Sequence, residues 1–367
     1  MPFVSTGKIN YSGFSDKSVL ESMMGGGSET PSAKSRYVFV GNDYKQYVTS
    51  DFSEWTTIDA HTDKQLGWGC YSKDHDLFVF RSGVKAAGPY WSSDLTTVEQ
   101  ATIDTEDTFD YYITPNYVSE CQLFCATNFT NPRNLCPILT SKDGKNWTVH
   151  SDDSARSTST NTNFAYMEHL NRIVSVAYNT GDIVYSDDQG ESWIKTTISN
   201  KFPISKGSNY PLCYNKDDQL IYGFDASSVY QKLMVLKSAD GLVWEDFITI
   251  PTTSNSDNLI FQQYIPEAGK VFFASINAVG TYSNDGTYHF VGKTEINMSQ
   301  AAYDPVAKKL IYVGSNSSTG FNDIYAIDYA DMLDETYTDV GSAPTLQPVY
   351  QIPRSGGPSG FNGVIVA

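Results

Sequence analysis

A short box that recurs along the chain is the strongest constraint on its fold. The most complete copy, at residues 186–193, reads S-x-D-x-G-x-S-W. Two copies, at 141–147 and 238–244, are one residue shorter, and three weaker copies begin at Thr49, Ser92 and Ser283. The box aspartates are spaced by 43, 49, 45, 52 and 45 residues: Asp51, Asp94, Asp143, Asp188, Asp240 and Asp285. One more period reaches Asp328, where the box has degenerated, which indicates seven units of about 45 residues.

Each unit has room for four short strands. An apolar run such as 173–176 or 271–274 precedes its box at a fixed distance, and from the second unit onward another run, such as 164–166, comes before it. Polar turns such as 215–218 join the two runs. Four-stranded units of this length, repeated radially, are typical of a β-propeller. We therefore expect an all-β, seven-bladed propeller of four-stranded blades over residues 36–340.

The residues of the box suit a tight turn between the third and fourth strands. The Ser or Thr hydroxyl and the Asp carboxylate can accept backbone N–H groups that the turn leaves unpaired. Glycine supplies a positive φ, and the closing tryptophan can cover the apolar edge between blades. We therefore expect structural, non-catalytic roles for Asp51, Trp55, Asp94, Asp143, Trp147, Asp188, Gly190, Trp193, Asp240, Trp244 and Asp285.

The two ends of the chain lie outside the repeat. Residues 1–35, with the spacer 25–28, are expected to form a flexible arm that either docks on another subunit or packs on the propeller. The tail 341–367 ends in a strand-like run at 360–367, which we expect to pair with the first blade and close the ring. A competing closure would use residues 8–11.

The boxes resemble those of the Asp-box, or BNR-repeat, propellers, a family that includes sialidases, over about residues 36–340. The resemblance implies the fold, and it implies that the box turns lie away from the central pocket. A sialidase would need several arginines that converge on a carboxylate. The chain has no arginine between Arg172 and Arg354 and lacks the F-R-I-P element of that family, so sialidase activity is not expected.

The opposite loop face is where a propeller usually binds its ligand. Aromatic side chains and an arginine there would suit a sugar, through stacking and a guanidinium clamp. The candidate ligand-binding residues are Tyr90, Trp91, Tyr111, Tyr112, Phe129 and Arg133. The five cysteines and five histidines show no metal-ligand spacing, so we expect free thiols, no metal and no cofactor.

Charge and composition guide the functional prediction. The net charge of −17 opposes binding to nucleic acid, and no apolar run is long enough to insert into a membrane. The first residues do not resemble a secretory signal, and the low charge and the wealth of Ser, Thr, Asn and Tyr are similar to bacteriophage virion proteins. We therefore expect a non-enzymatic virion component, in the tail or an appendage, that holds other virion proteins or contacts cell-surface carbohydrate for host attachment. The alternative is a glycoside hydrolase that acts on a surface polysaccharide.

Overall fold

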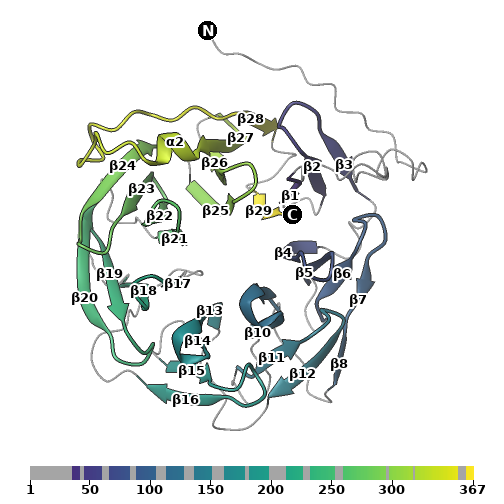
Figure 1. Ribbon diagram of the computed structural model, residues 1–367. Helices are drawn as coiled ribbons and strands as arrows, with labels where there is room; N and C mark the ends of the chain where they lie inside the picture. The colour runs from purple at the N-terminus through teal and green to yellow at the C-terminus, as the bar shows by residue number, and fades with distance from the viewer. Residues whose placement is uncertain are drawn as a thin grey trace.

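Seven antiparallel sheets stand like blades around a common centre in the computed structural model (Figure 1). The structure describes residues 35–41, 45–59, 66–82, 88–104, 113–127, 136–150, 161–177, 182–197, 212–225, 232–252, 259–294, 297–316, 319–353 and 361–367. The predicted all-β, seven-bladed propeller is confirmed. The arm at 1–34 and the competing closure at 8–11 lie outside the described residues.

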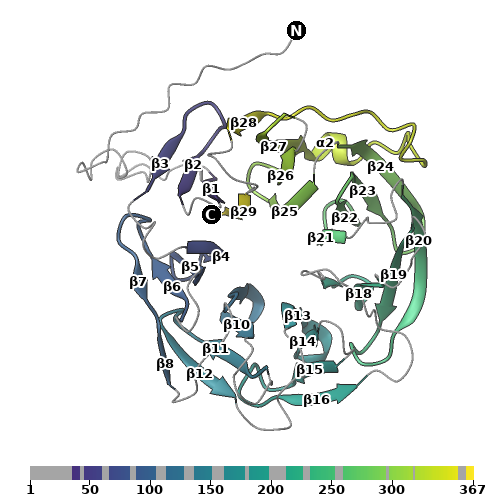
Figure 2. The same ribbon diagram turned by 180° about the vertical axis from the view of Figure 1, so that it is seen from behind.

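Each blade runs from a strand at the centre to a strand at the rim, as the view from behind also shows (Figure 2). Blades one to three are formed by β29 (Phe361–Val366), β1 (Tyr37–Gly41), β2 (Gln46–Thr49) and β3 (Thr56–Ile58); β4 (Leu66–Ser72), β5 (Leu77–Ser82), β6 (Tyr90–Ser92) and β7 (Glu99–Gln100); and β9 (Asn116–Val118), β10 (Leu123–Thr127), β11 (Ile138–Ser141) and β12 (Asn146–His150). Blades four and five are formed by β13 (Asn161–Met167), β14 (Arg172–Ala177), β15 (Asp182–Ser186) and β16 (Ile194–Thr197); and β17 (Cys213–Asn215), β18 (Leu220–Asp225), β19 (Lys232–Ser238) and β20 (Glu245–Pro251). Blades six and seven are formed by β21 (Leu259–Ile265), β22 (Lys270–Ser275), β23 (Ala278–Tyr282) and β24 (Tyr288–Lys293); and β25 (Asn297–Asp304), β26 (Lys309–Asn316), β27 (Phe321–Asp328) and β28 (Tyr350–Pro353).

The last strand of the chain closes the ring. β29 is the innermost strand of blade one, nearest the centre of the ring, and it pairs antiparallel with β1, with Val38 opposite Ile365 and Phe39 opposite Val364. Backbone hydrogen bonds of 2.8 Å join Arg36 and Ala367 in both directions. This is the pairing predicted for residues 360–367. Because β28 is the outer strand of blade seven, the seventh sheet also reaches beyond residue 340.

Several rim strands are covered by neighbouring chain. β8 (Thr102–Asp104) adds in parallel to β12, so the third sheet has five strands. The connection between β27 and β28 begins with the short helix α2 (Tyr329–Met332) and then follows β24 of blade six, where Phe290 N donates to Tyr337 O (Figure 1). The remaining helical pieces of the described chain are two 3₁₀ turns, η1 (Ser119–Cys121) and η2 (Glu168–Leu170). In these ranges, no helix is both long and apolar enough to cross a bilayer.

The core is divided among the seams between blades. The described residues form seven apolar clusters, and each fills one seam. Trp147 of blade three packs on blade two, Trp193 of blade four on blade three, and Trp244 of blade five on blade four. The indole N–H of each donates to the carbonyl of its own box glycine at 3.1–3.2 Å. Each box therefore locks its blade to the one before it in the chain.

The box glycines are required for close approach as well as for backbone conformation. Gly144 has φ +72°, and a Cβ there would lie 2.7 Å from Leu77 Cδ2 and 2.9 Å from Val79 Cγ2 of blade two. Two degenerate boxes keep the positive φ without glycine, at Phe52 (φ 64°) and Leu95 (φ 67°). Their side chains enter seams instead, which offsets the conformational cost of about 1–2 kcal/mol per residue.

We predict that Gly144→Ala destabilises the protein more than Gly286→Ala. Both glycines have positive φ, but a Cβ at Gly286 meets no atom within 4 Å. The Gly286 variant should lose about 1–2 kcal/mol from backbone strain, and the Gly144 variant about 1–3 kcal/mol more from overpacking against blade two. Urea denaturation followed by tryptophan fluorescence measures both. Equal losses would show that the close approach at Gly144 is unimportant.

Deleting residues 361–367 should abolish soluble, cooperative folding. The deletion removes β29, leaves β1 as an open edge and takes Val364 and Ile365 out of two seams. Circular dichroism during heating measures the transition. A truncated protein with the melting temperature of the full chain would contradict this account of ring closure.

Candidate functional site

Two of the six expected ligand residues lie in the described part of the chain, and they occupy different seams. Tyr90 is buried in the seam between blades one and two. Trp91 packs in the next seam, where the Lys145 ammonium lies 4.1 Å from the centre of its ring. Tyr111, Tyr112, Phe129 and Arg133 lie outside the described residues. Both described members therefore take part in packing between blades.

The box turns hold their aspartates in dense hydrogen bonding. In blade three, Asp143 Oδ1 accepts the backbone N–H groups of Lys145 and Asn146, each at 2.8 Å, and Ser141 Oγ accepts that of Gly144 at 2.8 Å. Asp188 Oδ1 accepts Ser192 N at 2.9 Å in blade four. The same arrangement holds Asp94, Asp240, Asp285 and Asp51 in their turns.

These hydrogen bonds fix the charge of the box carboxylates. Partial burial would raise the pKa of Asp143, but the N–H groups donated by Asn146 and Lys145 outweigh it and hold the pKa at about 2. The pKa of Asp188 is also lowered, since the hydrogen bonds from Ser192 and Ser186 outweigh its desolvation. Such carboxylates stay ionised at neutral pH and cannot donate a proton to a substrate.

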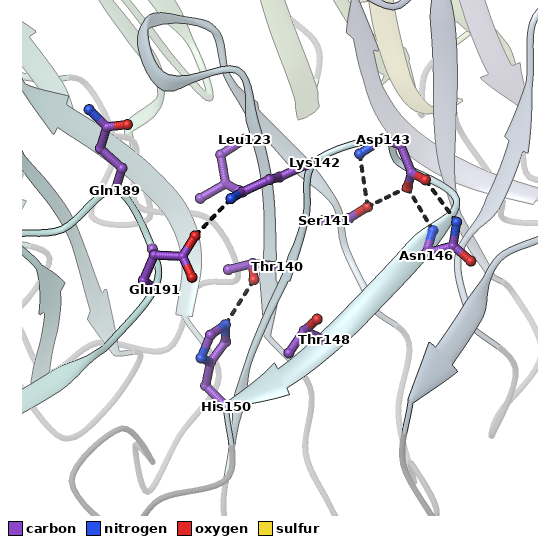
Figure 3. A pocket seen from close by; sticks show the side chains of 11 residues that line it. Leu123, Thr140, Ser141, Lys142, Asp143, Asn146, Thr148, His150, Gln189 and Glu191 are labelled. Atoms are coloured by element: carbon purple, nitrogen blue, oxygen red, sulfur yellow. Dashed lines mark hydrogen bonds and ion pairs between the residues drawn. The ribbon is translucent and has the colours of Figure 1, made fainter.

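A polar groove of about 390 Å³ opens in the seam between blades three and four (Figure 3). Its size is within the range of small-molecule sites, about 300–1,000 Å³. The groove begins beside the box turns, which lie on the opposite side of the disc from the expected ligand loops. Its lining includes Thr140, Lys142, Asn146, Thr148, His150 and Glu191.

The β11–β12 hairpin supplies most of this lining because its two faces differ. Thr140 lies opposite Thr148, and Ile138 lies opposite His150, so both threonines and the histidine project from the same face. The other face carries Leu139 and Trp147, which pack on blade two. The hairpin is therefore apolar toward blade two and largely polar toward blade four.

At one position of the repeat, blade three has a shorter residue than blades two, four and five. The residue before the box serine is Trp91 in blade two, Tyr185 in blade four and Lys237 in blade five. In each of those blades it pairs with a cation or an aromatic ring, since Arg172 lies 4.6 Å from the Tyr185 ring and Lys237 lies 5.0 Å from a phenylalanine ring. Blade three has Thr140 there, which lines the groove, whereas the equally short Val48 of blade one is buried in an apolar seam.

Two polar pairs occupy the groove. Thr140 Oγ1 lies 2.8 Å from His150 Nε2, and the His150 ring is held edge-on, 6.4 Å from Trp193. Lys142 Nζ donates to Glu191 Oε1 at 2.7 Å across the seam. Both members of this ion pair are well exposed, with side chains 77% and 68% accessible. Thr140 is therefore buried in the lining of the groove, whereas the exposed ion pair can be separated by a ligand.

A second hollow of about 270 Å³ adjoins the first toward the turns between the inner strands. It is lined by His75, Gln122 and Asp188, and it shares Leu123, Lys142, Gln189 and Glu191 with the groove. Cys121 also lines it, but burial and the charge of Glu120 raise the pKa of this thiol to about 12. The protonated thiol is a poor nucleophile.

Sequence reasoning missed the groove residues Thr140, Lys142, His150 and Glu191. A signal was present, because the residue before the first box residue is short and polar only in blade three among blades one to five, where the others have Val48, Trp91, Tyr185 and Lys237. All five cysteines are free thiols. In the chain segments that the structure describes, no cluster of three or more His, Cys, Asp or Glu side chains is placed to hold a metal ion.

Comparison with known proteins supports the fold and not a family. No protein-family model matches the chain, and no curated protein matches its sequence. A protein from Lactobacillus plantarum is 14% identical, with a TM-score of 0.60 over 91% of this chain and 100% of that one. The Pseudomonas aeruginosa periplasmic gluconolactonase is 11% identical, with a TM-score of 0.56 over 89% and 99%. A predicted 6-phosphogluconolactonase from Bacteroides fragilis is 11% identical, with a TM-score of 0.58 over 93% and 100%.

The prediction of a non-enzymatic bacteriophage virion component is wrong. The structures that share this fold over nearly the whole chain include those named as lactonases. The prediction was based on composition, which reflects solubility and surface character and contains no information about a site.

We predict that Asp143→Asn makes stability less dependent on pH between pH 4 and 2. The pKa of Asp143 is lowered from 3.8 to about 2 in the folded protein, so its contribution is present above pH 4 and is lost as the pH falls toward 2. Because the turn is partly exposed, we expect about 0.5–1 kcal/mol. Urea denaturation across this pH range measures the slope, with Thr148→Val as an uncharged control. Identical slopes in the wild type and Asp143→Asn would contradict the assignment.

Proposed function

We propose that this chain is a hydrolytic Asp-box propeller that acts on lactones of sugar acids, with the groove between blades three and four as its active site. The observation that carries the proposal is the Thr140–His150 pair, 2.8 Å apart in a polar groove. That separation is typical of a nucleophile and its general base. The substrate class follows the names of structures with the same fold, the gluconolactonases.

Membership of the Asp-box family is part of the proposal. It is supported by turns in which Ser, Asp, Gly and Trp each have a defined contact: the hydroxyl and carboxylate accept backbone N–H groups, and the indole donates to the glycine carbonyl. The same contacts recur at 186–193 and 238–244.

A lactone is a cyclic ester, so its hydrolysis needs a nucleophile and a proton for the leaving oxygen. With the Thr140 hydroxyl donating to His150 Nε2, attack of Oγ1 on the carbonyl carbon passes the proton to the imidazole. The ring C–O bond then breaks, and the imidazolium gives that proton to the leaving oxygen, which becomes a hydroxyl group. In the second step the neutral imidazole takes a proton from a water molecule as its oxygen attacks the threonine ester, and the imidazolium returns that proton to Thr140 Oγ1 as the C–Oγ1 bond breaks, which gives the sugar acid and free Thr140.

A positive charge at the edge of the groove supports this chemistry. Negative charge develops on the carbonyl oxygen during attack, and a nearby cation stabilises it. Lys142 supplies an ammonium group at the edge of the same groove, and Glu191 holds it there in the resting protein. Since the Lys142 side chain is largely exposed, it can turn from Glu191 toward a bound substrate.

The groove does not favour glycoside hydrolysis. That reaction needs two carboxyl groups, one of them protonated at working pH. Asp143 and Asp188 are committed to their turns, with lowered pKa values, and cannot serve as the acid. Glu191 is then the remaining carboxylate of the groove, and a single carboxylate cannot supply both the acid and the base or nucleophile of that reaction.

We predict that Thr140→Val lowers kcat for glucono-δ-lactone by at least about 100-fold, because it removes the nucleophile with little change in volume. Thr140→Ser should keep activity within about tenfold, and His150→Gln should lose about as much as Thr140→Val. A pH-stat measures acid release after subtraction of spontaneous hydrolysis.

The matched control is Thr249→Val, at an exposed position of β20. It should leave kcat unchanged, and all variants should melt within a few degrees of the wild type. Full activity in Thr140→Val would overturn the proposed active site.

A further inference from the structure

The two hollows, together called the trench, adjoin each other at the seam. They share Leu123, Lys142, Gln189 and Glu191, so the Lys142–Glu191 pair lies between two compartments. One compartment contains the Thr140–His150 pair. The other extends to blade two, where His75 lines it.

The ion pair between the compartments is a weak barrier. Its atoms are 2.7 Å apart, but its side chains are 77% and 68% accessible, and a pair this exposed adds little to stability. A ligand with suitably placed hydroxyls can separate it and bond to both partners. The trench can therefore hold a molecule longer than either hollow alone.

The lining of the second compartment indicates what kind of molecule fits. Gln122 and Gln189 contribute amides, each able to donate and accept hydrogen bonds. The charged side chains along the trench are Lys142 against Asp143, Asp188 and Glu191, an excess of negative charge that disfavours an anionic chain. A neutral chain with many hydroxyl groups satisfies both conditions.

We infer that the trench binds a neutral oligosaccharide whose last unit is a sugar-acid lactone, with the lactone at Thr140 and the preceding sugars beside Gln122. The placement of the lactone rests on the proposed function. The binding of the sugar chain rests on the trench alone and is tested separately.

The first experiment measures binding without turnover. Glucose, maltose, maltotriose and maltohexaose are titrated against the full-length protein by NMR or calorimetry, and affinity should rise with length until the trench is filled. Gln122→Ala should weaken binding of the longer sugars by about 3–10-fold, the effect of one hydrogen bond, and leave glucose unchanged. Affinity that does not rise with length, or tighter binding of oligogalacturonate, would overturn the inference.

Gln219→Ala is the matched control. Gln219 ends the corresponding turn of blade five with the same left-handed backbone, φ 57° against 51° at Gln122, but lines neither hollow. It should bind all sugars as the wild type does. Equal losses in the two variants would show that Gln122 acts through the fold.

The second experiment separates this inference from the proposed function. Maltobionolactone should be hydrolysed with a higher kcat/KM than glucono-δ-lactone, and Gln122→Ala should remove most of that advantage while sparing the smaller substrate. Length-dependent binding without hydrolysis of either lactone would support the trench and overturn the proposed function. Hydrolysis of both lactones at equal kcat/KM, with no length-dependent binding, would overturn the trench alone.

Discussion

The structure depends on the packing of blade on blade, and at three successive seams a box from one blade packs on the sheet of the preceding blade. Trp147, Trp193 and Trp244 fill three successive seams and donate to the carbonyls of Gly144, Gly190 and Gly241. No single blade of four short strands buries enough surface to be stable alone, so burial between neighbours holds the disc together. The ring closes when β29 joins blade one as its innermost strand. The inner edge of β1 is then paired and no longer free.

The same dependence explains why one seam can carry a site. The box tryptophan of one blade fills part of a seam, and the residue before the box serine of the preceding blade helps to fill the remainder. Cation–aromatic pairs fill it around Trp91, Tyr185 and Lys237. At Thr140 a short side chain leaves a groove, and the polar face of β11–β12 lines it. The groove therefore lies where the neighbouring seams have packed cation–aromatic pairs.

Hydrogen bonding distinguishes the acidic groups that hold the turns from the acidic group that lines the groove. Box aspartates are the most regularly spaced acids in the chain, yet hydrogen bonds within their turns outweigh desolvation and lower the pKa values of Asp94, Asp143, Asp188 and Asp240. Glu191 has no such role in its turn, and its carboxylate reaches across the seam to Lys142. The acids that recur at the repeat spacing have structural roles in their turns. Glu191, which is not part of the repeat pattern, is the acid that lines the groove.

The sequence by itself determined the seven units, their four strands and the residues of the box turns, because these features are local or periodic and spacing and residue type are enough to find them. For ring closure it offered two candidates, residues 360–367 and 8–11, and the structure shows the pairing of the final strand with blade one. The position of the groove was decided by tertiary structure, because Thr140 and His150 come from blade three while Glu191 comes from blade four. The contact of Trp91 across its seam was likewise beyond sequence reasoning, since its neighbour Lys145 belongs to the next blade. Contacts across a seam join residues of different repeats, and a linear pattern does not show which side chains leave space between them.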